Sequence, residues 1–201
     1  MKKQAIAIAL LTLLGAQASA QESPWLVRVR ALHLSPADKS DQVGGTGASD
    51  RINVSSKNMP DVDISYFFSP NISAELVLTY PQKHDVYLDG GKIGTFKHLP
   101  PTLLGQYHFT NGTAFTPYLG AGINYTNISK VELLDGAGGL EHKSWGPAVQ
   151  AGLDYAIDKN WSFNVDVKKI RIRSDVYISG AKASYVKVDP LLFGVGVGYR
   201  F

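Results

Sequence analysis

The histidines of this sequence are its candidates for metal binding or proton transfer, and there are five of them. His98 and His108 lie ten residues apart in one expected strand. At the usual rise per residue they are separated by about 33 Å, so these two cannot share an ion. His33, His84 and His142 fall at expected strand ends or in expected loops. We therefore expect no metal site.

Two other patterns could support catalysis or cofactor binding. Ser129, His142 and Ser144 offer a nucleophile and a base, but no spacing marks them as a catalytic set. The alternating glycines from Gly194 to Gly198 superficially resemble a dinucleotide-binding loop. No helix is expected after them, so no helix N-terminus is available to a phosphate. The sequence therefore predicts no catalytic residue and no cofactor.

Charged residues alternate with apolar ones in several segments. Arg28 and Arg30 are interleaved with valines, and Asp61 and Asp63 flank Val62. Successive side chains of a strand point to opposite faces, so the charges share one face. A charge in a narrow interior is costly without a partner. We therefore expect an internal charge network made of Arg28, Arg30, Asp61, Asp63, Glu75, Asp154 and Asp166. The alternative is that these charges are solvated in the lumen.

Eight segments with strand character must position these residues. Their expected spans are 24–34, 58–68, 72–82, 97–109, 115–127, 143–157, 161–173 and 187–201. Tight turns are expected at 69–71, 110–114 and 158–160, and longer loops at 35–57, 83–96, 128–142 and 174–186. Short turns that alternate with long loops are typical of an outer-membrane barrel. A soluble β-sandwich has no reason to alternate in this way.

The last expected strand indicates which face is apolar. Its large apolar residues, from Phe193 to Phe201, share one face, and its glycines share the other. A membrane barrel turns apolar residues outward to lipid. In a closed sheet the first and last strands must be neighbours. The inward glycines of the last strand then leave space for the arginines of the first. The seventh strand fits less well, because it cannot place four cations inside without a bulge: Lys168, Lys169, Arg171 and Arg173.

Aromatic residues sort into two levels if the first strand rises from the periplasmic side. The lower level holds Trp25, Phe68, Phe109, Phe115, Trp161 and Phe201, and the upper level holds Tyr80, Tyr125 and Trp145. Two aromatic girdles around an apolar belt are what the two bilayer interfaces favour. The sequence therefore predicts an all-β fold, an eight-stranded antiparallel transmembrane β-barrel of up-and-down topology.

Residues 1–20 are interpreted as a signal peptide. Lys2 and Lys3 precede an apolar run, and Ala18-Ser19-Ala20 gives a cleavage pattern. Residues 21–201 then form a single outer-membrane barrel, with 18 of the 20 basic residues against 17 acidic ones. This near balance argues against binding to nucleic acid. Because there is no cysteine, the barrel must close by packing and hydrogen bonding alone.

Several motifs together resemble those of the outer membrane protein W family. They are His98-Leu99-Pro100-Pro101-Thr102, Gly120 to Tyr125, Ser144-Trp145-Gly146 and Gly198-Tyr199-Arg200-Phe201, and they span the expected mature chain in the order of the family. The resemblance implies an eight-stranded barrel with a narrow, partly hydrophobic lumen, passage of small apolar molecules and a link to stress responses. It also implies a bacterial outer-membrane location and recognition of the terminal Phe201 by the barrel assembly machinery.

The expected function is a narrow channel or binding tunnel for small hydrophobic molecules, in contact with outer-membrane lipid and lipopolysaccharide. Proline donates no ladder hydrogen bond, so prolines near the outer ends of strands two to four predict a lateral opening into the outer leaflet. The alternative is that these prolines only end the strands at the loops. The residues of this opening are Leu32, Leu34, Pro60, Pro81, Pro100 and Pro101. Two alternatives stay open. One is a closed structural barrel whose loops serve stress resistance, adhesion or receptor contacts, and the less favoured one is a lipid A-modifying enzyme.

The leader and the alternating segments give a testable prediction. Protein purified from the outer membrane should begin at Gln21, which mass spectrometry of the intact chain will measure. The unboiled protein should migrate differently from the boiled one in a detergent gel, because a closed barrel binds less detergent than an unfolded chain. A purified chain that keeps its leader, or a helical circular dichroism spectrum, would contradict this interpretation.

Overall fold

The computed structural model describes residues 23–201, so the expected signal peptide and its cleavage site lie outside the described residues. Within these residues the secondary structure is mainly β-strand. Its elements are β1 (Trp25–Ser35), β2 (Lys39–Ser40), β3 (Ile52–Val54), β4 (Lys57–Ser69), β5 (Ile72–Leu78), β6 (Gln82–Leu88), β7 (Gly91–Leu99), β8 (Thr102–His108), β9 (Phe115–Leu133), the 3-10 turn η1 (Leu134–Gly136), β10 (Gly138–Leu140), β11 (Lys143–Ala156), β12 (Trp161–Ile170), β13 (Arg173–Ile178), β14 (Ala181–Lys187) and β15 (Leu191–Arg200). Within residues 23–201, no helix has the length and apolar character needed to cross a membrane.

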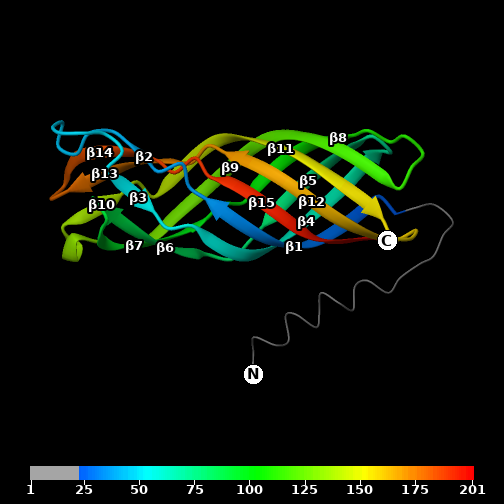
Figure 1. Cartoon of the computed structure of the whole chain (residues 1–201), viewed down its shortest axis with the longest axis horizontal. Coiled ribbons are helices and arrows are strands. Elements are labelled where there is room, and N and C mark those ends of the chain that lie inside the picture. The colour runs from blue at the N-terminus through cyan, green and yellow to red at the C-terminus, as the bar shows by residue number, and fades with distance from the viewer. Residues whose placement is uncertain (1–22) are drawn as a thin grey trace, which may run out of the picture.

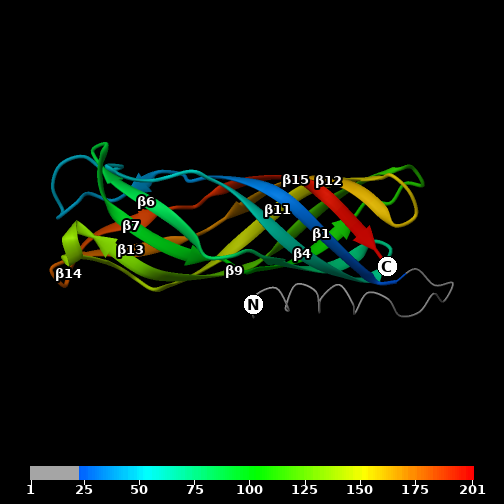
Figure 2. The same cartoon turned by 90° about the horizontal axis from the view of Figure 1, so that it is seen from below.

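Eight of these strands close on themselves. Each pairs antiparallel with the next in the order β1, β4, β5, β8, β9, β11, β12, β15 and back to β1. Figures 1 and 2 show the resulting elongated barrel, and we call the end that carries the C-terminus the lower barrel. The predicted fold class, a closed eight-stranded antiparallel barrel, is confirmed.

The expected long loops are wrong for much of their length. Range 83–96 is mostly the β6–β7 hairpin, and range 174–186 is mostly the β13–β14 hairpin. Ranges 35–57 and 128–142 hold β2, β3, the end of β9 and β10. Together these strands form what we call the upper barrel, at the opposite end from the C-terminus (Figure 1).

A missed turn signal explains part of this error. Asp89 and Gly90 both have positive φ, as do Ser179 and Gly180 at the tip of the other hairpin. Two consecutive residues of this kind are typical of two-residue hairpin turns, and Asp-Gly is one of the strongest sequence signals for them. The two hairpins could therefore have been recognised from their tips.

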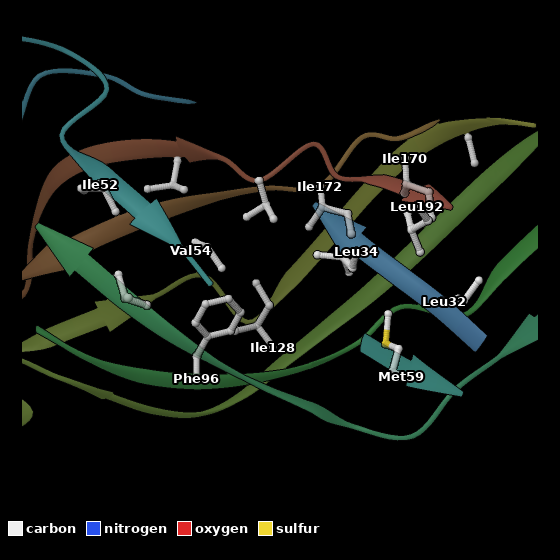
Figure 3. Close-up of a cluster of buried hydrophobic side chains, with 14 of the residues drawn as sticks. Leu32, Leu34, Ile52, Val54, Met59, Phe96, Ile128, Ile170, Ile172 and Leu192 are labelled. Carbon is white, nitrogen blue, oxygen red and sulfur yellow. The ribbon is translucent and has the colours of Figure 1, made fainter. Parts of the chain in front are cut away.

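The apolar surfaces of the lower and upper barrels face opposite directions. In the lower barrel, large apolar side chains such as Leu119 and Val195 are exposed on the outside, and charged residues are buried inside. In the upper barrel the interior is mainly apolar, as Figure 3 shows for Val54, Phe96 and Ile128. An outward apolar belt with a polar interior is the pattern of a membrane-spanning barrel. The upper barrel has the pattern of a protein surrounded by water.

This reversal corrects the expectation for strand seven. Lys168 is buried in the lumen, but Lys169 and Arg171 are exposed on the outside, above the apolar belt. Arg173 is also partly exposed and forms an ion pair with Asp189. No bulge is needed to bring four cations inside, because only Lys168 is there.

The apolar belt gives a prediction about stability. Leu119 lies on the outside of β9, midway between the two aromatic levels, and is 54% exposed. An arginine at the middle of a membrane costs about 2–4 kcal/mol in a barrel of this type. Leu119→Arg should therefore lower the free energy of unfolding in lipid vesicles by about that amount. Asn127→Arg, also outward on β9 but above the belt, is the control and should change it little. Equal effects of the two variants would contradict the placement of the belt.

Candidate functional site

The lumen of the lower barrel contains a network of buried ion pairs. Arg28 and Arg30 project inward from β1 and are at most 1% exposed. Arg28 pairs with Asp63 of β4 at 3.2 Å and with Asp154 of β11 at 2.7 Å. Arg28 also donates to the hydroxyl of Ser65 at 3.2 Å. A single guanidinium thus joins β1 to strands on both sides of the lumen.

Arg30 is the centre of the network. Its guanidinium lies 2.8 Å from Asp61 and 3.0 Å from Asp63. It also reaches Glu75 at 3.4 Å and Asp166 at 3.1 Å, so it contacts four carboxylates from three strands. The seven residues of the expected charge network therefore lie together in the lumen.

The strand register explains this arrangement. Arg28 lies opposite Asp63 and Gly198, and Arg30 lies opposite Asp61 and Gly196. A Cβ atom built on Gly196 would overlap the Val29 carbonyl oxygen and press on the side chain of Arg30. Glycine at this position therefore leaves room for the Arg30 side chain.

Sequence reasoning missed several members of the network. Lys168 contacts Asp166 and lies 3.9 Å from Glu75. Gln106 donates to Gln150 at 2.9 Å, and Gln150 donates to Asp166 at 2.7 Å. Their position in the alternating pattern could have identified these residues, because each shares the inward face of its strand with network residues that the sequence did predict. With these members included, polar side chains that bind one another cross the lumen at the level of Arg28 and Arg30.

The upper lumen is mainly apolar and continues directly above the charged network. Leu32, Leu34 and Met59 are buried at its lower end, as Figure 3 shows. Higher up it contains a cavity of about 30 Å³, lined by Ile52, Val54, Val86, Ile93, Phe96, Ile128, Leu133, Leu140, Ser174, Val176, Val186 and Val188. A space of this size holds about one water molecule. The apolar side chains therefore pack against one another and fill most of the lumen.

The wall of the barrel has a gap between its third and fourth strands. The β5–β8 ladder ends at the pair Val77 and Thr102, and the β6–β7 ladder begins at Gln82 and His98. Among the described strands, residues 78–81 and 99–101 form no ladder pair across this gap. Three of the prolines predicted to line a lateral opening lie within this gap: Pro81, Pro100 and Pro101.

A change of side-chain parity contributes to this gap. In β5 the buried residues are odd-numbered, such as Val77, whereas in β6 they are even-numbered, such as Gln82 and His84. A regular strand cannot change parity, so residues 79–81 must be irregular. Pro60 was expected near a strand end, but it lies inside β4, opposite Ala31 and on the outer face.

Two histidines are buried just above the gap. The Nδ1–H group of His84 donates to the carbonyl of Ser55 at 2.7 Å, which leaves its Nε2 as an acceptor for Nε2–H of His98 at 3.2 Å. Burial lowers the pKa of His84, and burial together with the neighbouring His84 lowers the pKa of His98 to about 3. Both imidazoles are therefore neutral near pH 7. His84 was expected at a strand end or in a loop, but it lies inside β6.

Aromatic side chains mark the two edges of the apolar belt. Most residues of the expected girdles are exposed, and Trp145 is the most exposed of the upper level at 67%. Tyr125 packs on Trp145 with ring centroids 4.7 Å apart. At the lower edge Phe201 packs on Tyr199, which in turn packs on Trp161. These residues lie where an outer-membrane barrel meets the two lipid headgroup regions.

Comparison with known proteins identifies the family. The model of the OmpW family matches residues 21–201. The chain belongs to the OmpW family. Outer membrane protein W of Escherichia coli is 34% identical over 215 residues that cover both chains completely. The outer-membrane protein y4mB of Sinorhizobium fredii is 43% identical over 186 residues, which cover 89% of this chain and 80% of that protein.

Solved structures agree with this assignment. The crystal structure of the outer membrane protein OprG from Pseudomonas aeruginosa is 29% identical and superposes with a TM-score of 0.79 over 90% of this chain and 97% of that chain. OmpW-family proteins are non-enzymatic barrels of the bacterial outer membrane, so the lipid A-modifying enzyme is ruled out.

A more distant relative, 25% identical over 90% of each chain, is the dibenzothiophene metabolism operon protein PahQ of Pseudomonas aeruginosa.

The position of Arg30 gives a prediction. Removal of one partner from a buried ion pair costs about 3–5 kcal/mol, because the remaining charges are left without compensation. Arg30→Met should lower the free energy of unfolding, measured by urea denaturation in lipid vesicles, by about that amount. Arg171→Met removes an exposed guanidinium and is the matched control, with an expected change near zero. A loss below about 1 kcal/mol for Arg30→Met would show that the network is not a stabilising element.

Proposed function

We propose that this OmpW-family barrel is a narrow channel that admits small hydrophobic molecules into its upper lumen and releases them sideways into the outer leaflet. The observation that carries the proposal is the order of the two lumen regions. An apolar solute entering from outside meets buried leucine, valine and phenylalanine side chains first. It then meets the ion pairs of Arg28 and Arg30, where desolvation of buried charges opposes its passage.

The gap between the third and fourth strands supports a lateral route. It lies at the height where the apolar lumen meets the charged network. The last pair below it is Val77 with Thr102, and Val77 also lies opposite Asp63 of the network, while the first pair above it is Gln82 with His98. Leu104 and Val77 are buried on its inner side, and Leu103 and Tyr80 are exposed on its outer side. Apolar surface is thus present on both sides of a stretch of wall that lacks ladder pairs.

The nature of the solute is suggested by one relative. PahQ is named for a dibenzothiophene metabolism operon, and dibenzothiophene is a flat apolar aromatic heterocycle. The upper lumen is lined by aliphatic side chains and Phe96, which suit a ligand of this class. We propose small, uncharged aromatic or aliphatic molecules of low polarity as substrates, and not charged or strongly hydrated solutes.

A second candidate is a closed structural barrel that acts through its outer end in stress resistance, adhesion or receptor contacts. The packed upper lumen favours it, since a cavity of about 30 Å³ is too small for an aromatic hydrocarbon. For the channel, the apolar side chains must move apart to admit a solute. Uptake measurements separate the two candidates.

Three proposals about processing and partners accompany the channel. Residues 1–20 are a signal peptide that is removed after Ala20. The terminal Phe201, which donates its backbone N–H to the Trp25 carbonyl at 3.2 Å, is the signal read by the barrel assembly machinery. The exposed apolar belt contacts membrane lipid, with lipopolysaccharide around its upper edge.

A disulfide staple tests the lateral route. The chain has no cysteine, so Pro81→Cys with Pro101→Cys places one removable bridge across the gap, or a neighbouring pair if its geometry is better. Uptake of a small apolar probe into vesicles should fall when the staple is oxidised and recover on reduction.

A matched staple controls for rigidity of the wall. Tyr125→Cys with Trp145→Cys bridges a directly paired site of β9 and β11 at the upper edge of the belt, and it should leave uptake unchanged. Unchanged uptake with a fully formed gap staple would reject the side exit. No uptake in any state would favour the structural barrel.

A further inference from the structure

Two lysines face each other on the outer surface directly above the gap. Lys83 of β6 lies opposite Lys97 of β7, one pair above the first rung of that ladder. Both point outward, because each lies between two buried residues of its strand. Directly opposed residues have Cβ atoms about 5 Å apart, and like charges in this position are destabilising. An anion bound between the two lysines would relieve this repulsion.

Neither lysine forms an ion pair with an acidic side chain of the described residues, 23–201. Asp85 is the acidic neighbour on β6, but it is paired with Lys92 at 2.7 Å. Glu132 of β9 lies opposite Thr95 and lines the same surface cavity as Lys83, but it forms no ion pair with either lysine. The two cations thus remain available to a ligand from outside.

The surface below the lysines is suited to lipid chains. Leu78, Tyr80 and Leu103 are 40–53% exposed on the outer face around the gap. Tyr80 belongs to the upper aromatic level, which marks the depth of the lipid headgroups. Cations just above this level lie where lipid phosphates are found, and exposed leucines just below it lie where acyl chains begin.

We propose that Lys83 and Lys97 bind the phosphate of one outer-leaflet lipid, whose acyl chains cover the outside of the gap. The residues assign the chemistry, a phosphorylated lipid, which is either lipopolysaccharide or a phospholipid. The proposal does not depend on transport. It concerns what occupies the outer face of the gap whether or not a solute ever leaves through it.

The experiment reports on lipid at the gap itself. Leu103→Cys is labelled with a fluorophore, and the full barrel is placed in vesicles that contain brominated phosphatidylglycerol or brominated phosphatidylcholine, both of which quench it. Without the lysine site, both lipids should quench alike. With it, phosphatidylglycerol should quench at a mole fraction about 30-fold lower, since two lysines near an anionic lipid contribute about that factor together.

Substitutions test the assignment to the two lysines. Lys83→Gln with Lys97→Gln should abolish the preference, and Lys83→Arg with Lys97→Arg should keep it. The matched control is Lys143→Gln with Arg171→Gln, which removes two exposed cations above the belt on β11 and after β12. The control should behave as the parent does. If both Gln pairs lose the lipid preference equally, the preference comes from all the cations around the upper edge and not from a specific site, and the proposal is wrong.

Competition identifies the source of the phosphate. Lipopolysaccharide that relieves quenching at a lower mole fraction than unlabelled phosphatidylglycerol assigns the site to lipopolysaccharide, and the opposite order assigns it to phospholipid. Relief by inorganic phosphate in solution would show an anion site without a lipid and would overturn the proposal. So would equal quenching by the two brominated lipids in the parent barrel.

Discussion

Every strand of this barrel that continues into the upper barrel must leave hydrocarbon and enter water, and this constraint organises the structure. On β12 and the residues after it, inward positions change from Asp166 and Lys168 to Ile170 and Ile172, while outward positions change from Val167 to cations. The side chains keep their directions. What changes is which direction is apolar, because the medium outside the wall changes from lipid to water.

The same constraint explains which parts of the structure the sequence could predict. In the membrane, an alternating pattern with one apolar parity identifies each strand, and closure of the sheet then places Arg28 and Arg30 beside Asp61, Asp63 and inward glycines. Above the membrane the pattern inverts, so strands appear to end there. His84, Val86 and Phe96 were consequently assigned to a loop, although they are buried in paired strands. The position of Lys168 was uncertain because its neighbours Lys169 and Arg171 already belong to the inverted region.

The gap at Pro81 and Pro101 lies at this same boundary. The sequence indicated it through prolines, which cannot complete a ladder. It did not indicate the parity change between β5 and β6, which depends on how many irregular residues separate two strands and is visible only in the structure. It also could not show that His84 links the Ser55 carbonyl to His98 across neighbouring strands, because these contacts join segments up to 29 residues apart.

The packed upper lumen has a consequence for how tightly any molecule can be held there. The residues that would contact a solute are the same residues that hold the upper barrel together. To open a space of about 150 Å³, enough for a small aromatic ring, costs about 3–4 kcal/mol of lost packing. The favourable contacts of a bound molecule must exceed this free-energy cost before it binds with net affinity. Binding strength and fold stability are thus in direct competition for any molecule that enters the upper lumen.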